Sequence, residues 1–342
     1  MNETHHIYFS KDATSYDFYN NVLSQLHEYF KEGTKSKLVI DFSEVEYISP
    51  LVVPNILTVG YILKTYFESP VELLIPWKPK MISYLNDVGF LSQLKNYDLF
   101  DVDERFIGDL ECTGLYPGCS TYSFEPSMAY EDIRFKLKRS LNIINDLAET
   151  MKINVENRTE WLLNILTELC FNACAHSGNL CFATIQTNLI DEHKHKKAYV
   201  SISDCGQGLY KTLSTKFAAE SIQPVTTTTQ RFLNLDQSIK NIYAILESVF
   251  YRKNYKIFGL FHVVDKTISN NGIIRMHTDD TQIIFTSDSF KKYVDSPEKL
   301  VTNLQNKFNK VLENELEIKY SPVRKSVSRF KGVHIELELP LN

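Results

Sequence analysis

One amphipathic helix constrains the fold of this chain more than any other segment. Residues 161–178 read WLLNILTELCFNACAHSG. Apolar residues recur along it at helical spacing, which predicts a helix with one face in a core; they are Leu162, Ile165, Leu166, Leu169 and Ala173. Glu168, Asn172 and His176 follow one another at four-residue intervals and therefore share one side of the helix. A carboxylate and a carboxamide in line beside an apolar face are costly to bury unless each has a partner.

Two environments would give partners to these polar side chains. A divalent cation carrying phosphates is one: the side-chain carbonyl of Asn172 is a ligand that magnesium accepts. Glu168 would then be placed to take a proton from a water or hydroxyl nucleophile. A solvated helix edge is the other, and the E-x-x-x-N string by itself favours it because such strings are common.

Length and composition limit the class of protein. With 342 residues the chain can form two domains, each burying its own core. The formal net charge of −5 gives no overall attraction to nucleic acid or to a membrane surface. No apolar run approaches the roughly 18 residues that span a bilayer, and the first ten residues do not resemble a secretory signal. The six cysteines include no CxxC pair, which fits a reducing compartment, so we expect a cytoplasmic protein.

The first hundred residues alternate between two kinds of segment. Short β-rich runs and stretches of helical periodicity follow one another, which predicts a small α/β domain around a central sheet. The expected strands are 6–10, 37–42 and 71–76, and the expected helices are 16–31, 51–67 and 80–88.

Part of this domain resembles a known family. The run LVIDFSEVEYISPLVVPNILTVGYIL (38–63), with MISYLNDVGFLSQL (81–94) as the closing helix, is similar to the core of STAS domains, the fold of bacterial anti-sigma-factor antagonists. The resemblance implies a strand whose turn feeds a helix, with a phosphorylatable serine where the helix starts. Ser49-Pro50-Leu51-Val52 stands at that place, and neither proline nor leucine can be phosphorylated. We expect Ser49 to be the N-cap of the helix rather than a phosphosite.

Residues 101–128 are the expected linker, because glycines and prolines break any long element there. Helical periodicity resumes at 130–152, and strand patterns follow the polar helix at 180–189 and 197–203. The second strand ends in Asp204, with Gly206 and Gly208 close behind. The carboxylate can accept the exocyclic amine of adenine, and the glycines let the backbone approach the base. A tight turn is the alternative explanation of this D-x-G-x-G string.

The order of the two motifs carries a second resemblance. ELCFNACAH followed by DCGQGL resembles the N box and first glycine box of the GHKL superfamily of Bergerat-fold ATPases, which includes gyrase, heat-shock chaperones, sensor kinases and anti-sigma serine kinases. The resemblance implies an α/β sandwich, with a mixed sheet covered on one face by helices, that binds ATP and Mg²⁺. It makes Glu168 the catalytic residue and Asn172 the metal ligand. The implied nucleotide contacts are Asn172, His176, Asp204, Gly206, Gly208, Leu209, Arg252, Lys256, Gly259 and Leu260.

The rest of the chain departs from that family pattern in two places. Ile257 stands where the second glycine box has its first glycine, so Gly259 and Leu260 are what remains of it. Val333 replaces the usual threonine of the closing strand, expected at 331–340. Arg252 and Lys256 fall in the region that corresponds to the ATP lid, where they would meet the γ-phosphate or be solvated.

The predicted organisation is a STAS-like domain at 1–100, a linker at 101–128 and a GHKL-type ATP-binding domain at 129–342, with an insertion at 289–330. Residues 319–331 carry five basic side chains and no acid. A solvated surface is the first explanation of such a run, and a patch for a nucleic acid or another phosphate-bearing partner is the alternative. We expect an ATPase whose lid closure controls a protein partner or a homodimer. A protein serine kinase of the anti-sigma type, and a nucleotide-gated module with little turnover, are the alternatives. The missing glycine and threonine favour the last, and the Glu168–Asn172 pair favours catalysis.

Overall fold

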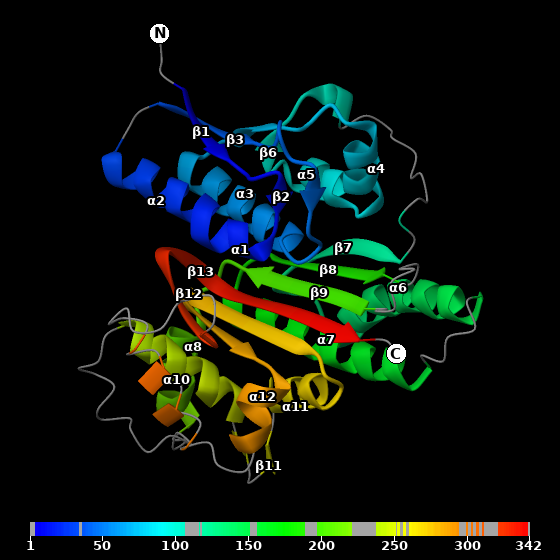
Figure 1. Ribbon diagram of the computed structural model, residues 1–342, viewed down its shortest axis with the longest axis vertical. Coiled ribbons are helices and arrows are strands. Elements are labelled where there is room, and N and C mark those ends of the chain that lie inside the picture. Colours follow the sequence, from blue (N-terminus) through cyan, green and yellow to red (C-terminus); the bar gives the residue numbers. More distant parts are fainter. Residues whose placement is uncertain are drawn as a thin grey trace.

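The computed structural model describes the chain apart from residues 1–3, 34–35, 107–115, 117, 151–155, 189–196, 221–236, 251, 254–255, 258–259, 294–298, 300–301, 304–305, 308–309, 311–320 and 341–342. Figure 1 shows two sheets with helices between them, and a further layer of helices on the far side of the larger sheet. No helix within the described ranges is both long enough and apolar enough to cross a membrane.

The N-terminal part is the α/β domain that the alternating pattern predicts. Its four strands are all parallel, in the order β1-β3-β5-β6: β1 Thr4–Tyr8, β3 Lys37–Asp41, β5 Val71–Leu74 and β6 Phe100–Asp101. A short parallel pair, β2 Asp12–Ala13 and β4 Tyr47–Ile48, lies beside them. The helices are α1 Ser15–Asp17, the π-helical η1 Phe18–Val22, α2 Leu23–Glu32, α3 Val53–Phe67, α4 Pro79–Asp87 and α5 Phe90–Tyr97.

The expectation that Ser49 caps the following helix is wrong. The N-cap of α3 is Val52, and it makes no side-chain capping hydrogen bond. Ser49 instead begins a separate turn, in which its carbonyl accepts from the amide of Val52 at 3.1 Å and its hydroxyl accepts from the amide of Leu51 at 3.4 Å. The helix starts after this turn because Pro54, in the first helical turn, supplies a fixed φ at no hydrogen-bond cost.

The C-terminal part contains a five-stranded sheet in the order β12-β13-β9-β8-β7. The strands are β7 Cys119–Phe124, β8 Cys181–Asn188, β9 Lys197–Asp204, β12 Ile273–Phe285 and β13 Val323–Pro340. Every neighbouring pair is antiparallel, so the expected mixed sheet is not what forms. The reason is the place of β13: it enters between β9 and β12, which run parallel to each other, and is antiparallel to both.

Two expected boundaries also change. Strand β7 lies inside the stretch expected to be linker, and it pairs with β8 from Cys119↔Gln186 to Phe124↔Cys181. Cys119, Thr121 and Phe124 of this strand are buried, which explains why six residues between two breaker-rich stretches form an edge strand. Similarly, residues 323–330 of the expected insertion are the first part of β13, where Arg324 pairs with Gln282 of β12.

The large sheet is covered on both faces. One face carries the expected helix layer, made of α6 Tyr130–Thr150, α7 Glu156–Ser177, α8 Leu209–Glu220, α10 Gln237–Phe250 and α11 Leu260–Ser269. The other face packs against α2, α3 and α5 of the N-terminal domain (Figure 1), which a prediction of helices on one face misses. Cys119, Phe182 and Phe330 of the sheet accordingly belong to the same apolar core as the N-terminal strands. Burying both faces of one sheet joins the two domains through a shared core.

Polar contacts fix how α3 sits on that face. Asn55 is fully buried and donates to the hydroxyl of Tyr19 at 3.1 Å. The Thr58 hydroxyl donates to the carbonyl of Ser203 at 3.4 Å, directly before Asp204. The N-terminal domain therefore lies behind the strand end that carries the predicted nucleotide site.

Candidate functional site

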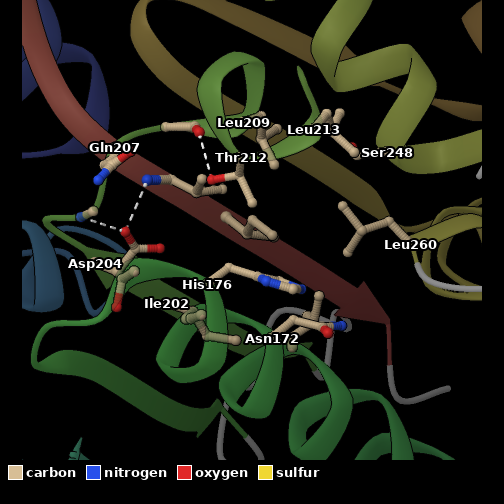
Figure 2. Close-up of a pocket in the computed structure, with 17 residues that line it drawn as sticks. Asn172, His176, Ile202, Asp204, Gln207, Leu209, Thr212, Leu213, Ser248 and Leu260 are labelled. Atoms are coloured by element: carbon tan, nitrogen blue, oxygen red, sulfur yellow. Dashed lines mark hydrogen bonds between the residues drawn. The ribbon is translucent and has the colours of Figure 1, made fainter. Parts of the chain in front are cut away.

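A pocket opens on the helical side of the sheet where α7, the end of β9 and the start of α8 meet (Figure 2). Leu209 and Thr212 of α8, Ser248 of α10 and Leu260 of α11 close it from the other side. Its volume is about 130 Å³. A cavity of roughly 150 Å³ in another protein holds benzene, so this space suits a flat ring system.

Asp204 is the charged group at one end of the pocket. Its side chain is 2 % exposed, and its Oδ1 accepts from the amide of Gly206 at 2.8 Å and from the amide of Val333 at 3.4 Å. No described residue donates to Oδ2, which is left for a ligand. Burial raises the pKa of this carboxyl to about 7, against the two amide hydrogen bonds, which lower it. Asp204 therefore offers one accepting oxygen whose charge depends on pH near neutrality.

Close backbone packing around Asp204 requires two glycines. A Cβ on Gly206 would lie 2.6 Å from the Cα of Ser177 at the end of α7. Gly332, on β13, has φ +105°, and a Cβ there would lie 1.8 Å from the carbonyl oxygen of Asp204. These contacts hold the Asp204 turn tightly between α7 and β13 and so fix the position of the carboxylate at the pocket.

Helix α7 brings two of its three predicted polar residues to the pocket. Asn172 and His176 line it (Figure 2), together with Leu169 and Ala173. Glu168 lies one turn closer to the N-terminus of the helix and is not among the lining residues. The amide nitrogen of Asn172 donates to Oε1 of Glu168 at 3.2 Å. This bond occupies the Asn172 nitrogen and leaves its carbonyl oxygen available to a cation, so the predicted Glu168–Asn172 pair exists as a contact.

Thr278 does not line the pocket but supports a turn that does, and the sequence did not indicate it. Its hydroxyl, on β12, donates to the carbonyl of Gly332 at 3.0 Å and accepts from the amide of Leu209 at 3.3 Å. It thereby ties the Gly208–Leu209 turn to the strand that holds Gly332. Ser248 and Thr212 were likewise missed, because single hydroxyl residues in helices and strands form no motif.

Other predicted residues divide between the pocket and the undescribed parts of the chain. Gly208 and Leu209 line the pocket, as does Leu260. Gly259 lies outside the described residues. Arg252 belongs to β10 (Arg252–Lys253) and Lys256 to β11 (Lys256–Ile257), which pair antiparallel, but the placement of their side chains is outside the described part. Their contact with a γ-phosphate stays a prediction.

A magnesium ion would find few protein ligands here. Among the residues that the structure describes, no group of three or more His, Cys, Asp or Glu side chains could hold a metal ion. The donor set fits an ion that is held mainly by phosphates and water, with the carbonyl of Asn172 as its protein ligand.

Sequence and structure comparisons add no relative to this description. The chain matches no protein-family model, no curated protein and no solved structure. Any function proposed for it therefore rests on the chemistry of its own residues.

Proposed function

We propose that this chain binds ATP together with Mg²⁺ in the pocket between α7, α8 and β13. The observation that carries the proposal is Asp204, a buried carboxylate with one oxygen committed to two amides and the other left for a ligand. The turn after Asp204 supports it, because Gly206 and Gly208 line the pocket with backbone beside that carboxylate.

The single available oxygen favours adenine over guanine. Adenine presents one amine donor on the edge that would meet Oδ2. Guanine presents an adjacent ring N–H and amine, which a carboxylate accepts best with both oxygens. Since Oδ1 already accepts two amides, the bidentate arrangement would cost at least one of those bonds. The mostly apolar lining from Leu169, Leu209 and Leu260 suits the faces of a base.

We assign the binding of the ATP phosphates to residues of α7. Asn172 would hold the magnesium ion, which supplies neutralisation of phosphate charge when bound. Glu168, held by the Asn172 amide, is the group on this helix able to take a proton from an attacking water. The activity we propose is therefore ATP hydrolysis coupled to lid closure, which controls a protein partner or a homodimer.

A protein serine kinase of the anti-sigma type and a nucleotide-gated module with little turnover are the two alternatives. The position of the N-terminal domain decides whether a kinase site could phosphorylate Ser49 of its own chain. Ser49 is 8 % exposed, and α3 packs on the sheet face opposite to α7. The N-terminal domain of the same chain does not present that serine to the pocket, so a kinase would act on a separate protein.

Titration calorimetry tests the binding proposal. We expect ATP with Mg²⁺ to bind the wild type, and Asp204→Asn to weaken binding by roughly 1–3 kcal/mol, the cost of an impaired buried polar contact. Asp280→Asn is the matched control, because Asp280 is also buried but bonds to Ser238 and Asn241 away from the pocket. Asn172→Ala should abolish the dependence of affinity on Mg²⁺. The proposal fails if the wild type does not bind ATP, or if Asp204→Asn and Asp280→Asn bind it equally well.

A further inference from the structure

A second cavity lies where the N-terminal domain meets the outer part of the large sheet. Its volume is about 480 Å³, and it shares no lining residue with the nucleotide pocket. One wall comes from the segment Thr14–Asn20 and the turn at Ser49 and Leu51; the other comes from β9, β12 and β13. Cavities of this size at domain boundaries are common places for small ligands.

Two arginines line the sheet side of this cavity. Arg275 of β12 makes an ion pair with Glu338, 2.7 Å between Nη1 and Oε1, and lies 3.9 Å from a carboxylate oxygen of Glu336. Arg324 of β13 is the second cation. The lining side chains thus include two guanidinium groups and one carboxylate, Glu338, which leaves the cavity wall with an excess of positive charge.

One of these charges, the guanidinium of Arg324, is partly buried and therefore partly removed from water. The pKa of Arg324 is lowered, first by burial and next by repulsion from the Arg275 guanidinium. Glu336 is buried behind this wall and offsets part of the charge, since its attraction raises the pKa of both arginines. An anion placed between the arginines would be attracted by both and would relieve their mutual repulsion.

A bend in the long β-ribbon brings the two arginines to one cavity. Arg275 and Gln282 both belong to β12 and both line it, although seven positions separate them. Between them Asp279 has φ +57°, and the pairing register with β13 shifts on both sides of that residue. The ribbon is thus not straight, and Arg324, the partner of Gln282, reaches the same space. Arg324 comes from the basic run at 319–331, to which the nucleotide pocket gives no role.

We propose that this inter-domain cavity binds a small organic phosphate, with the phosphate group held between Arg275 and Arg324. Guanidinium groups present paired donors that match phosphate oxygens. Hydroxyls of Tyr16 and Tyr199, which also line the cavity, can donate to the remaining oxygens or to the organic part. A ligand here touches both domains and would stabilise their packing.

The full-length chain is tested with inorganic phosphate and pyrophosphate as probes, by calorimetry and thermal shift at constant ionic strength. We expect both to bind, pyrophosphate more tightly, and to raise the melting temperature. Arg324→Gln should weaken binding at least tenfold. Arg324→Lys should bind less tightly than wild type, because lysine keeps the positive charge but lacks the paired N–H donors of the guanidinium group. Arg329→Gln is the matched control: Arg329 lies on the same strand, is 70 % exposed and does not line the cavity.

Four results would overturn the proposal. They are absence of phosphate and pyrophosphate binding to the wild type, unchanged affinity in Arg324→Gln with circular dichroism unaltered, an equal loss in Arg329→Gln, and equal or tighter binding of succinate. The first means that no site exists, the third means diffuse surface charge, and the last means a carboxylate ligand. Asn172→Ala, at the proposed phosphate end of the nucleotide pocket, separates the two sites: it should keep full pyrophosphate affinity, and loss of that affinity would place the phosphate in the nucleotide pocket instead.

Discussion

If the proposed pocket binds adenine, its affinity should depend on pH through Asp204. Burial raises the pKa of Asp204 to about 7, so this carboxyl changes charge between pH 6 and pH 8. The amine of adenine donates a hydrogen bond, and an ionised carboxylate accepts it more strongly than a protonated carboxyl does. Affinity should therefore rise with pH over this range.

The magnitude follows from the fraction of ionised Asp204. With a pKa of about 7, that fraction is roughly one tenth at pH 6 and nine tenths at pH 8. If only the ionised form binds, affinity increases about tenfold, or about 1.4 kcal/mol. The stability of the empty protein should move the other way. Because the pKa is raised above its unfolded value near 4, the free energy of unfolding falls as pH rises from about 4 to about 7, and this contribution is constant above that.

Calorimetry with adenosine is the cleanest assay, because adenosine has no phosphate to titrate in this range. The wild type should bind about ten times more tightly at pH 8 than at pH 6. Asp204→Asn should show weaker binding with no such slope. A flat wild-type profile would refute the proposed role of the ionised carboxylate. A slope that persists in Asp204→Asn would assign the titration to another group.

Three further changes test the site. Gly332→Ala should lower the free energy of unfolding in urea by roughly 3 kcal/mol, since a Cβ would collide with the Asp204 carbonyl and the backbone has positive φ; a change within about 0.5 kcal/mol would contradict this packing. Thr278→Val should weaken adenosine binding and cost roughly 1–3 kcal/mol of stability, because the amide of Leu209 and the carbonyl of Gly332 each lose a partner. Glu168→Gln should bind ATP as the wild type does but release phosphate about 10²–10⁴ times more slowly; unchanged release would remove Glu168 from the chemistry, and no release by the wild type, alone or with candidate partners, would leave a nucleotide-sensing module.

Local periodicity in the sequence determined the individual elements. Apolar spacing predicted α7 and α6, and β-rich runs predicted β8 and β9, because one side of each element must enter a core. The same reasoning placed Glu168, Asn172 and His176 on one side of α7, and the structure confirms that Asn172 and His176 face one pocket. Asp204 at a strand end before two glycines was equally visible, since strand, carboxylate and turn are neighbours in the chain.

Only the tertiary structure decided which distant segments meet. The insertion of β13 between β9 and β12 made the sheet antiparallel and set Gly332 against the carbonyl of Asp204. The pattern of β13 says that it is buried but not which strands it joins, because many pairings satisfy the same alternation. The apolar faces of α2 and α3 likewise did not reveal that they would cover the second face of a sheet formed by later residues. Period and composition report how much of an element is buried, whereas the identity of its neighbour depends on the shape and packing of the whole chain.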